Sequence, residues 1–327
     1  MKCKTCDVLG IGTPIVDQVI KTTHEFIASL PGKARGSHPV DYYTFLSILE
    51  KAKATPMTVS GGSAANTIKG LAMLGKSCRM FGKMGDDAAG AAFAESMRNA
   101  GVETHLLVTK HPTAQVACLV TPDNERTMRS FLGAGEHLEP DDLTPELFEG
   151  VTLVHIEGYL ADRPELLKKA MHLAKNAKAK VSFDLSSHEM VLKHKKQMVD
   201  LMAKNVDILF ANVDETKQIT GLDPEKGCLL LRDVCPTAVV KMGPGGCWVA
   251  NEDGCYHQVA IIPEQVMDTT GAGDLFASGF LYGYLEDADI RKCAHFGALV
   301  ATKTISVFGT GLTEEMWASL REKWKSL

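Results

Sequence analysis

The sequence predicts an α/β fold, with three α/β/α layers around a mostly parallel central sheet and a small second β-sheet. Strand-like and helix-like segments alternate through residues 152–304, which is typical of a parallel sheet with helices on both faces. β-rich pieces at about 14–60 and 102–132 interrupt this alternation. We therefore expect one domain over 1–327, in which these two inserted segments form a small sheet laid over the main one, called the lid below.

Each element follows from a local pattern of apolar and turn-forming residues. Short apolar runs predict strands at 7–12, 15–20, 77–82, 102–108, 115–121, 126–132, 152–158, 179–185, 206–212 and 237–243. Apolar residues at helical spacing predict helices at 42–52, 63–75, 86–100, 163–177, 188–204, 272–286, 289–304 and 313–325, and a short one ending at Gly221. Hairpins are expected around 122–124 and within 248–260.

Composition and charge narrow the classes of function. The 327 residues carry 35 Lys and Arg against 40 Asp and Glu, a formal charge of −5, so binding to a nucleic-acid backbone is not expected. The sequence holds nine cysteines without a disulfide framework. It has no run that approaches the roughly 18 apolar residues of a membrane span. We expect a reduced cytoplasmic protein, a monomer or a homodimer, with no nucleic-acid or membrane partner.

Three motifs resemble known sites but lack part of what those sites need. Residues 70–77, GLAMLGKS, match the Walker A pattern, yet the surrounding residues favour a helix over a glycine-rich loop that follows a strand. Gly10 and Gly12 follow the first strand without the third glycine of a dinucleotide fingerprint. Cys3 and Cys6 form half of a zinc site, and no second pair follows. A P-loop NTPase that uses 70–77 remains an alternative.

Residues 268–274, DTTGAGD, stand directly before a long apolar helix. The backbone N–H groups of Gly271, Ala272 and Gly273 would lie at the helix N-terminus, where the helix dipole favours an anion. Asp274 then lies in the first turn beside that anion. A carboxylate held there is placed to accept the proton of a hydroxyl group that attacks a phosphate. An N-capping aspartate after a glycine-rich turn is the alternative.

A second glycine-rich turn, GGSAAN at 61–66, also enters a helix. Its glycines let a ligand approach closely, and Asn66 both donates and accepts hydrogen bonds. Asp17, just after the first strand, is a short carboxylate that suits vicinal hydroxyl groups. A plain turn and a solvated loop carboxylate are the alternatives.

Together these segments resemble the ribokinase-like (PfkB) carbohydrate kinase family, which includes the adenosine kinases. The most specific element is DTTGAGD, and the others stand in the family's order: GGSAAN, GKMGDDAAG at 82–90, NVDE at 212–215 and VVKMGPGG at 239–246. The resemblance implies a three-layer core with a β-sheet lid, and Mg-ATP-dependent phosphorylation of a hydroxymethyl group on a sugar or nucleoside. The stretches GGSAANTIKGLAMLG and TPDNERTMRSFLGA resemble the adenosine kinase branch.

The same resemblance implies roles for individual residues. Asp274 matches the catalytic base, Gly271, Ala272 and Gly273 match the anion hole, and Arg126 matches an arginine near the phosphates. The resemblance assigns binding of the acceptor substrate to Asp17, Gly61, Gly62 and Asn66. It assigns binding of the nucleotide to Asn212, Glu215, Lys241, Gly243 and Gly246, and implies that Glu215 places Mg²⁺ through water. Asp268 and Thr270 match positions that hold a monovalent cation, with K⁺ as the candidate.

A non-catalytic nucleotide or sugar sensor on the same fold is the remaining alternative. A sensor needs neither Asp274 nor the pair of Asn212 with Glu215, so their presence favours catalysis. Resemblance at the level of the fold does not choose between a sugar and a nucleoside as the acceptor.

Overall fold

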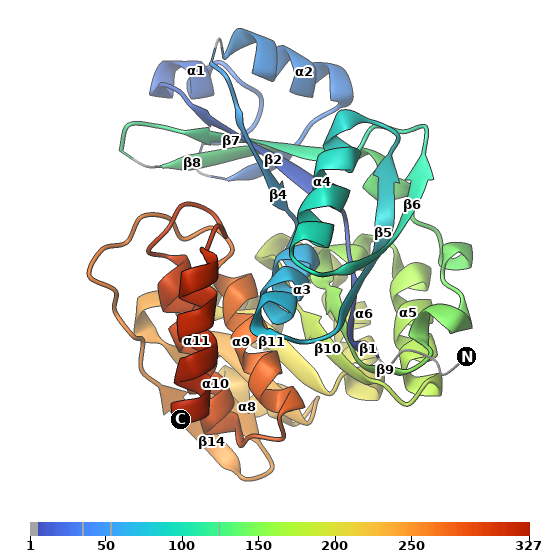
Figure 1. Ribbon diagram of the computed structural model, residues 1–327, viewed down its shortest axis with the longest axis vertical. Helices are drawn as coiled ribbons and strands as arrows, with labels where there is room; N and C mark the ends of the chain where they lie inside the picture. Colours follow the sequence, from blue (N-terminus) through green and yellow to red (C-terminus); the bar gives the residue numbers. More distant parts are fainter. Residues whose placement is uncertain (1–5, 35, 53, 124) are drawn as a thin grey trace.

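The structure, a computed structural model, describes residues 6–327 except 35, 53 and 124, and its chain forms two sheets (Figure 1). The large sheet contains β1 (Cys6–Ile11), β5 (Cys78–Gly85), β6 (Glu103–Thr109), β9 (Val151–Glu157), β10 (Lys180–Asp184), β11 (Ile208–Asn212), β12 (Thr237–Lys241), β13 (Cys247–Asn251) and β14 (Gly254–Gln258). The small sheet contains β2 (Ile15–Lys21), β3 (Ser37–Pro39), β4 (Met57–Gly61), β7 (Ala114–Val120) and β8 (Arg126–Phe131).

The large sheet is parallel except at one edge. Its strand order is β14-β13-β12-β11-β10-β9-β1-β5-β6, and only the pairings of β13 with β12 and β14 are antiparallel. The carboxyl ends of β9 to β12 therefore meet at a common edge, which is where open α/β sheets bind their ligands. The expected α/β class with a mostly parallel sheet is confirmed.

Helices cover both faces of the large sheet, which makes three layers. One face packs against α5 (Pro164–Asn176), α6 (His188–Asn205), α7 (Val213–Thr220) and α8 (Pro224–Arg232). The other packs against α3 (Ser63–Leu74), α4 (Ala88–Asn99), α9 (Ala272–Leu285) and α10 (Ile290–Thr304). Along β1, Val8 joins the second core while Leu9 and Ile11 join the first, because successive side chains of a strand point to opposite faces.

The remaining helices lie outside these layers. Trp317 and Trp324 of α11 (Glu314–Ser326) pack with residues of α3, α9 and α10. On the small sheet, α1 (His24–Ala28) and α2 (Tyr42–Lys51) bury Ile27, Phe45 and Ile48 against β2 and β7. Short 3-10 helices are η1 (Gly133–His137), η2 (Pro140–Asp142), η3 (Pro145–Phe148), η4 (Gly158–Asp162) and η5 (Gly243–Gly245).

The small sheet has the order β3-β8-β7-β2-β4 and lies over one end of the core (Figure 1). The expected hairpin around 122–124 joins β7 to β8. The strand expected at 102–108 is β6, however, and it pairs in parallel with β5 in the large sheet rather than joining the lid. It follows α4, so β5, α4 and β6 form a parallel crossover unit. The second inserted segment therefore contributes to the small sheet only from Ala114 onward.

The Walker A match at 70–77 is wrong as a phosphate loop. Gly70 lies inside α3, where a β-carbon would stand 2.4 Å from Ser278 Oγ, so this glycine serves helix packing. Gly75 caps the helix with φ of 108°. Lys76 pairs with Glu286, and its side chain is only 12% exposed. Within the part of the chain that the structure describes, no helix is both long and apolar enough to cross a membrane.

Candidate active site

The glycine turn before α9 forms the centre of the site. Gly271 is the N-cap, with φ of 69°, in the left-handed region that favours glycine. A β-carbon on Gly273 would lie 3.3 Å from the Nζ atom of Lys241, so the turn faces that ammonium. Since α9 is apolar and buried along most of its length, its N-terminus is held fixed by the core. The expected anion hole at residues 271–273 is thus a helix N-terminus with a cation beside it, in which the N–H group of Ala272 also donates to Thr269 O (3.3 Å).

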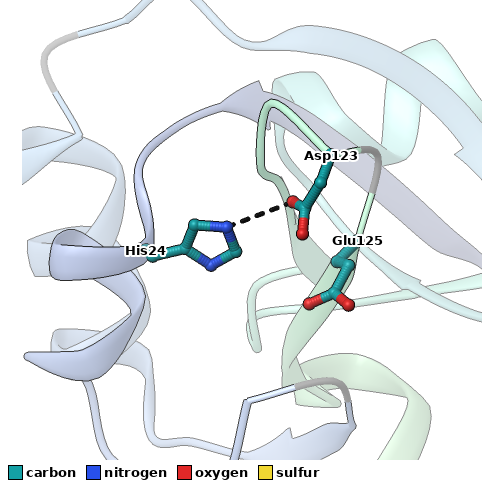
Figure 2. Close-up of side chains that lie close together, drawn as sticks. All are labelled: His24, Asp123 and Glu125. Atoms are coloured by element: carbon teal, nitrogen blue, oxygen red, sulfur yellow. Dashed lines mark ion pairs between the residues drawn. The ribbon is translucent and has the colours of Figure 1, made fainter.

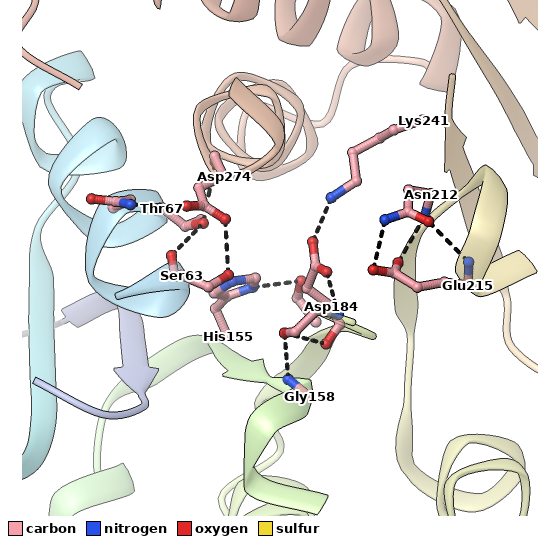
Figure 3. A network of polar contacts seen from close by, with 12 residues as sticks. Ser63, Thr67, His155, Gly158, Asp184, Asn212, Glu215, Lys241 and Asp274 are labelled. Atoms are coloured by element: carbon pink, nitrogen blue, oxygen red, sulfur yellow. Dashed lines mark hydrogen bonds and ion pairs between the residues drawn. The ribbon is translucent and has the colours of Figure 1, made fainter. Parts of the chain in front are cut away.

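Asp274, in the first turn of α9, is held by three side chains of α3 (Figure 3). Its two carboxylate oxygens accept hydrogen bonds from Ser63 Oγ (2.8 Å) and Asn66 Nδ2 (2.9 Å), and its carbonyl accepts from Thr67 Oγ1 (3.1 Å). Burial, with the negative charge of Asp184, raises the pKa of Asp274 to about 7, against the opposing effects of Asn66 and Lys241. The group is therefore suited to gain and lose a proton near neutral pH.

Asn66 contacts the expected base. Its side-chain nitrogen is used by Asp274, while its buried Oδ1 atom has no hydrogen-bond partner among the described residues. A buried acceptor without a donor is costly, so a hydroxyl donor from a ligand fits this position. The structure thus gives Asn66 a contact that positions Asp274, which the sequence did not predict. The Oδ1 atom of Asn66 is left to accept a hydrogen bond from a hydroxyl group of the substrate.

Polar residues end four neighbouring strands at the edge of the large sheet beside the site. Glu157, Asp184, Asn212 and Lys241 stand at the carboxyl ends of β9, β10, β11 and β12. Lys241 Nζ lies 2.6 Å from Asp184 Oδ2. Burial opposes the ammonium, but the charges of Asp184 and Glu215 outweigh it and raise the pKa of Lys241. Asp184 is a site residue that the sequence analysis missed, although it is a carboxylate that ends an apolar strand.

The expected pair of Asn212 and Glu215 forms a capping box at the start of α7. The two carboxylate oxygens of Glu215 accept from Asn212 Nδ2 (2.7 Å) and Asn212 N (2.8 Å), and Glu215 N donates to Asn212 Oδ1. Burial and the nearby charge of Asp184 raise the pKa of Glu215 to about 7. Beneath this row, His155 is buried against Ser182, and burial lowers its pKa to about 4, so it is neutral at pH 7.

Gly243 and Gly246, in the loop after β12, have different roles. A β-carbon on Gly246 would lie 2.0 Å from Gln258 O, so this glycine permits the turn into β13. A β-carbon on Gly243 would meet nothing within 4 Å. The space beside Gly243 is therefore the part of this loop that a ligand can approach.

Asp17, on β2, lies where the lid meets the core. A β-carbon on Gly61 would stand 2.4 Å from Asp17 Oδ2, so Gly61 makes room for the carboxylate. Gly62 has φ of 97° and a β-carbon there would strike Thr13 O at 2.7 Å. Burial raises the pKa of Asp17 to about 6, and the charge of Arg126 limits the rise. The structure thus brings Asp17 and both glycines to one side of the site.

Glu157 is a second residue that the sequence analysis missed. Its buried carboxylate accepts hydrogen bonds from Thr13 N (2.8 Å) and Ala64 N (3.1 Å), which joins the β1–β2 turn to the start of α3. It satisfies a free N–H group of a helix whose N-cap, Gly62, has no side chain. A β-carbon on Gly12 would lie 2.5 Å from Glu157, so this glycine serves the carboxylate rather than a dinucleotide.

Arg126 and Asp268 form an ion pair, with Arg126 Nη2 lying 2.5 Å from Asp268 Oδ1. Asp268 also accepts from the backbone N–H groups of Thr270 (2.7 Å) and Gly309 (2.8 Å). Burial opposes its charge, but these donors lower the pKa of Asp268. Arg126 is thus tied to the segment that leads into the glycine turn, and its expected contact with phosphates stays a prediction.

A further polar cluster lies on the lid surface (Figure 2). His24, at the start of α1, pairs with Asp123 in the β7–β8 turn at 3.2 Å, and Glu125 lies beside them. His24 and Asp123 are both largely exposed. Such a pair adds little to stability, and we regard it as a surface contact between α1 and the hairpin. Cys3, half of the C-x-x-C pair, lies outside the described residues.

Comparison with known proteins places this geometry in a family. The model of the pfkB family carbohydrate kinases matches residues 48–316. The chain belongs to the pfkB family. The probable sugar kinase protein from Rhizobium etli and the adenosine kinase from Sinorhizobium meliloti are each 31% identical over 98% of this chain and 100% of theirs, with TM-scores of 0.90 and 0.89.

Curated relatives of this pfkB-family chain carry sugar kinase names. A 5-dehydro-2-deoxygluconokinase of Listeria monocytogenes is 27% identical over 75% of this chain and 80% of its own length. An uncharacterized sugar kinase of Archaeoglobus fulgidus is 27% identical over 73% of this chain and 96% of its own. The chain is therefore an ATP-dependent sugar or nucleoside kinase, a phosphotransferase with an alcohol group as acceptor. The expected family, fold and activity are confirmed, and a P-loop NTPase is excluded.

Proposed function

We propose that this kinase transfers the γ-phosphoryl group of ATP to the hydroxymethyl group of a neutral sugar or nucleoside with vicinal hydroxyls, with Asp274 as the general base. The observation that supports this most is the position of Asp274, directly after the glycine turn and across from Lys241. Its raised pKa of about 7 suits a group that must accept a proton at neutral pH.

The residues around Asp274 have complementary roles in the proposal. The N–H groups of residues 271–273 and the ammonium of Lys241 stabilise negative charge on the phosphoryl oxygens. Ser63 and Asn66 hold the carboxylate of Asp274 in place through hydrogen bonds to both of its oxygens. Asp184 orients Lys241 toward the glycine turn. The space beside Gly243 receives the nucleotide.

Mg²⁺ fits the nucleotide side because of the charges gathered there. The carboxylates of Asp184, Glu215 and Asp274 act on a single ammonium, that of Lys241, and the pKa values of Glu215 and Asp274 are both raised. A site with surplus negative charge favours a divalent cation. Glu215, held by Asn212, would place the ion through water, and Mg²⁺ when bound would neutralise phosphate charge.

On the acceptor side, we propose that Asp17 binds vicinal hydroxyl groups. A buried carboxylate with two acceptor oxygens matches two adjacent O–H donors. The same charge disfavours a carboxylate on that part of the acceptor, which argues for a neutral sugar or nucleoside over a sugar acid. The adenosine kinase of Sinorhizobium meliloti, 31% identical, makes a nucleoside a reasonable first choice.

We further propose a cytoplasmic protein that acts as a monomer or a homodimer. The described cysteines are all free, as in a reducing compartment, and a kinase needs a supply of ATP. One chain supplies all the residues named above, so a partner subunit is not required for the reaction.

ATP consumption with a panel of acceptors tests the proposal. We expect turnover with adenosine or a ribose-type sugar, and much weaker turnover with the matching 2-deoxy compound. Asp274→Asn should lower kcat by roughly 10²–10⁴-fold. Glu225→Gln, which alters an exposed carboxylate in the first turn of α8, is the matched control and should leave kcat unchanged. Turnover of Asp274→Asn at the wild-type rate would contradict the proposal.

A further inference from the structure

The pair of Arg126 and Asp268 joins the two parts of the molecule. Arg126 is the first residue of β8 in the small sheet, and Asp268 precedes the glycine turn of the core. The carboxylate of Asp268 is 1% exposed and the guanidinium side chain of Arg126 is 21% exposed. The contact is therefore a largely buried ion pair between the lid and the segment that forms the anion hole.

The carboxylate of Asp268 organises two loops of the core. Oδ1 accepts from Thr270 N as well as from Arg126, and Oδ2 accepts from Gly309 N. The guanidinium also lies over the ring of Phe308, 5.8 Å from its centroid. Asp268 thus fastens the start of the glycine turn to the loop at 308–309, and a positive charge must accompany it because a buried unpaired carboxylate is costly.

The family resemblance implies that this positive charge is a monovalent cation at Asp268 and Thr270. The residues present do not fit such an ion. The charge of Asp268 is already balanced by a guanidinium at 2.5 Å, so a dissolved cation would have to bind beside another cation. Of the two side chains that the resemblance assigns to the cation, only Asp268 carries a charge, and Arg126 already balances it.

We propose that the guanidinium of Arg126 takes the place of the monovalent cation at Asp268. The loop that forms the anion hole is then ordered by a residue of the lid rather than by a dissolved ion. Arg126 also acts on Asp17, since its charge limits the rise of the pKa of that carboxylate. One side chain therefore links the acceptor side, the lid and the glycine turn, and the enzyme should not require potassium.

Thermal unfolding in different chloride salts tests this inference without relying on kinase activity. At fixed ionic strength, the Tm of the wild-type chain should agree within about 1 °C in potassium, sodium and tetramethylammonium chloride, since no monovalent cation binds at Asp268 when Arg126 is present. Arg126→Met leaves the carboxylate of Asp268 without a charged partner. Its Tm in tetramethylammonium should be lower by roughly 5 °C or more, and potassium should recover part of that loss.

Two controls assign the potassium response to Asp268. Arg126→Met combined with Asp268→Asn should lose the response, because the charge that attracts the ion is gone. Lys83→Met breaks a comparable half-buried pair, Lys83 with Asp142 at 2.5 Å, and should lose stability without any potassium-specific recovery. A potassium-dependent Tm in the wild-type chain overturns the inference, and so does an Arg126→Met variant indifferent to the cation. If Arg126→Met does not fold, the wild-type salt series still decides.

Discussion

At the scale of single residues, the protonated form of Asp274 favours stability, whereas the proposed catalysis needs the ionised form. Its pKa rises from an ordinary value of 3.8 to about 7 because burial and the charge of Asp184 oppose ionisation. The folded state therefore binds a proton more tightly than the unfolded state, and this contribution to stability is lost as the pH rises through about 7. The ionised form that the proposed proton transfer requires is thus the form that the fold disfavours.

This conflict predicts a pH dependence of the rate. We expect kcat to fall as the pH drops below the pKa of Asp274, about 7, because the protonated carboxyl cannot accept a proton. Steady-state rates from pH 5 to 9 measure this, and the residual activity of Asp274→Asn should lack that acid limb. An acid limb that is unchanged in Asp274→Asn would show that another group titrates.

Asp17 gives a second prediction at this scale. Asp17→Ala should raise the acceptor KM by about tenfold or more, because a charged hydrogen bond contributes roughly 1.5–3 kcal/mol. The ATP KM should hardly change, since Asp17 lies on the lid strand β2 and not on the nucleotide side. Substrate-saturation curves for both substrates separate the two effects. An acceptor KM equal to that of the wild type would remove Asp17 from the acceptor site.

At the scale of elements, the N-termini of two helices form the site, whereas the Walker A match at residues 70–77 takes no part in it. The N-terminus of α9 carries the glycine turn, and that of α3 carries Ser63 and Asn66, which hold Asp274. Residues 70–77 lie at the other end of α3 and have a packing role. The chemistry therefore depends on where a helix begins, because only its first N–H groups are free to bind an anion.

This arrangement predicts opposite outcomes for two substitutions. Gly273→Val should lower kcat strongly, because even a β-carbon there lies 3.3 Å from Lys241 Nζ and a larger side chain would displace the ammonium. Lys76→Ala should keep kcat and lose at most about 1 kcal/mol of unfolding free energy, as expected for a pair with a partly exposed partner. Kinetics and chemical denaturation measure these changes. An inactive Lys76→Ala enzyme would contradict the site assignment.

The sequence was most informative where local chemistry decides the structure. The helix at 63–75, the short helix ending at Gly221 and the glycine turn before α9 all follow from neighbouring residues. Asp184 and Glu157 were missed because their partners, Lys241 and Ala64, are 57 and 93 residues away along the chain. Such contacts follow from strand order, which residue patterns do not specify.

The elements of 24–60 were only partly anticipated for a related reason. Strand β3 is three residues long and pairs with β8, which lies far along the chain. Helix α8 was also missed, although Asp223 accepts a hydrogen bond from Lys226 N and Pro224 is its first residue, a recognisable start signal. The assignment of 102–108 to the lid failed because a strand pattern alone does not tell which of two sheets it joins.

At the scale of the whole molecule, the small sheet should act as a lid. Its strand β2 carries Asp17, the proposed acceptor ligand, and its strand β8 carries Arg126, which pairs with Asp268 of the core. We expect amide exchange in β2, β7 and β8 to slow when acceptor and a non-hydrolysable ATP analogue bind together. Peptides from α5 should exchange equally with and without ligands. Unchanged exchange in the small sheet would argue against closure.

The position of β1 has a consequence for how the protein is made. This strand leaves the ribosome before both of its neighbours, β5 and β9, and β9 is synthesised about 140 residues after β1. Until then one edge of β1 has backbone N–H and C=O groups without partners, and such edges promote association between chains. When β9 arrives it also delivers Glu157, which fastens the β1–β2 turn to α3. A nascent chain shorter than this therefore exposes an unpaired strand edge, and its β1–β2 turn is fastened to α3 only when β9 is in place.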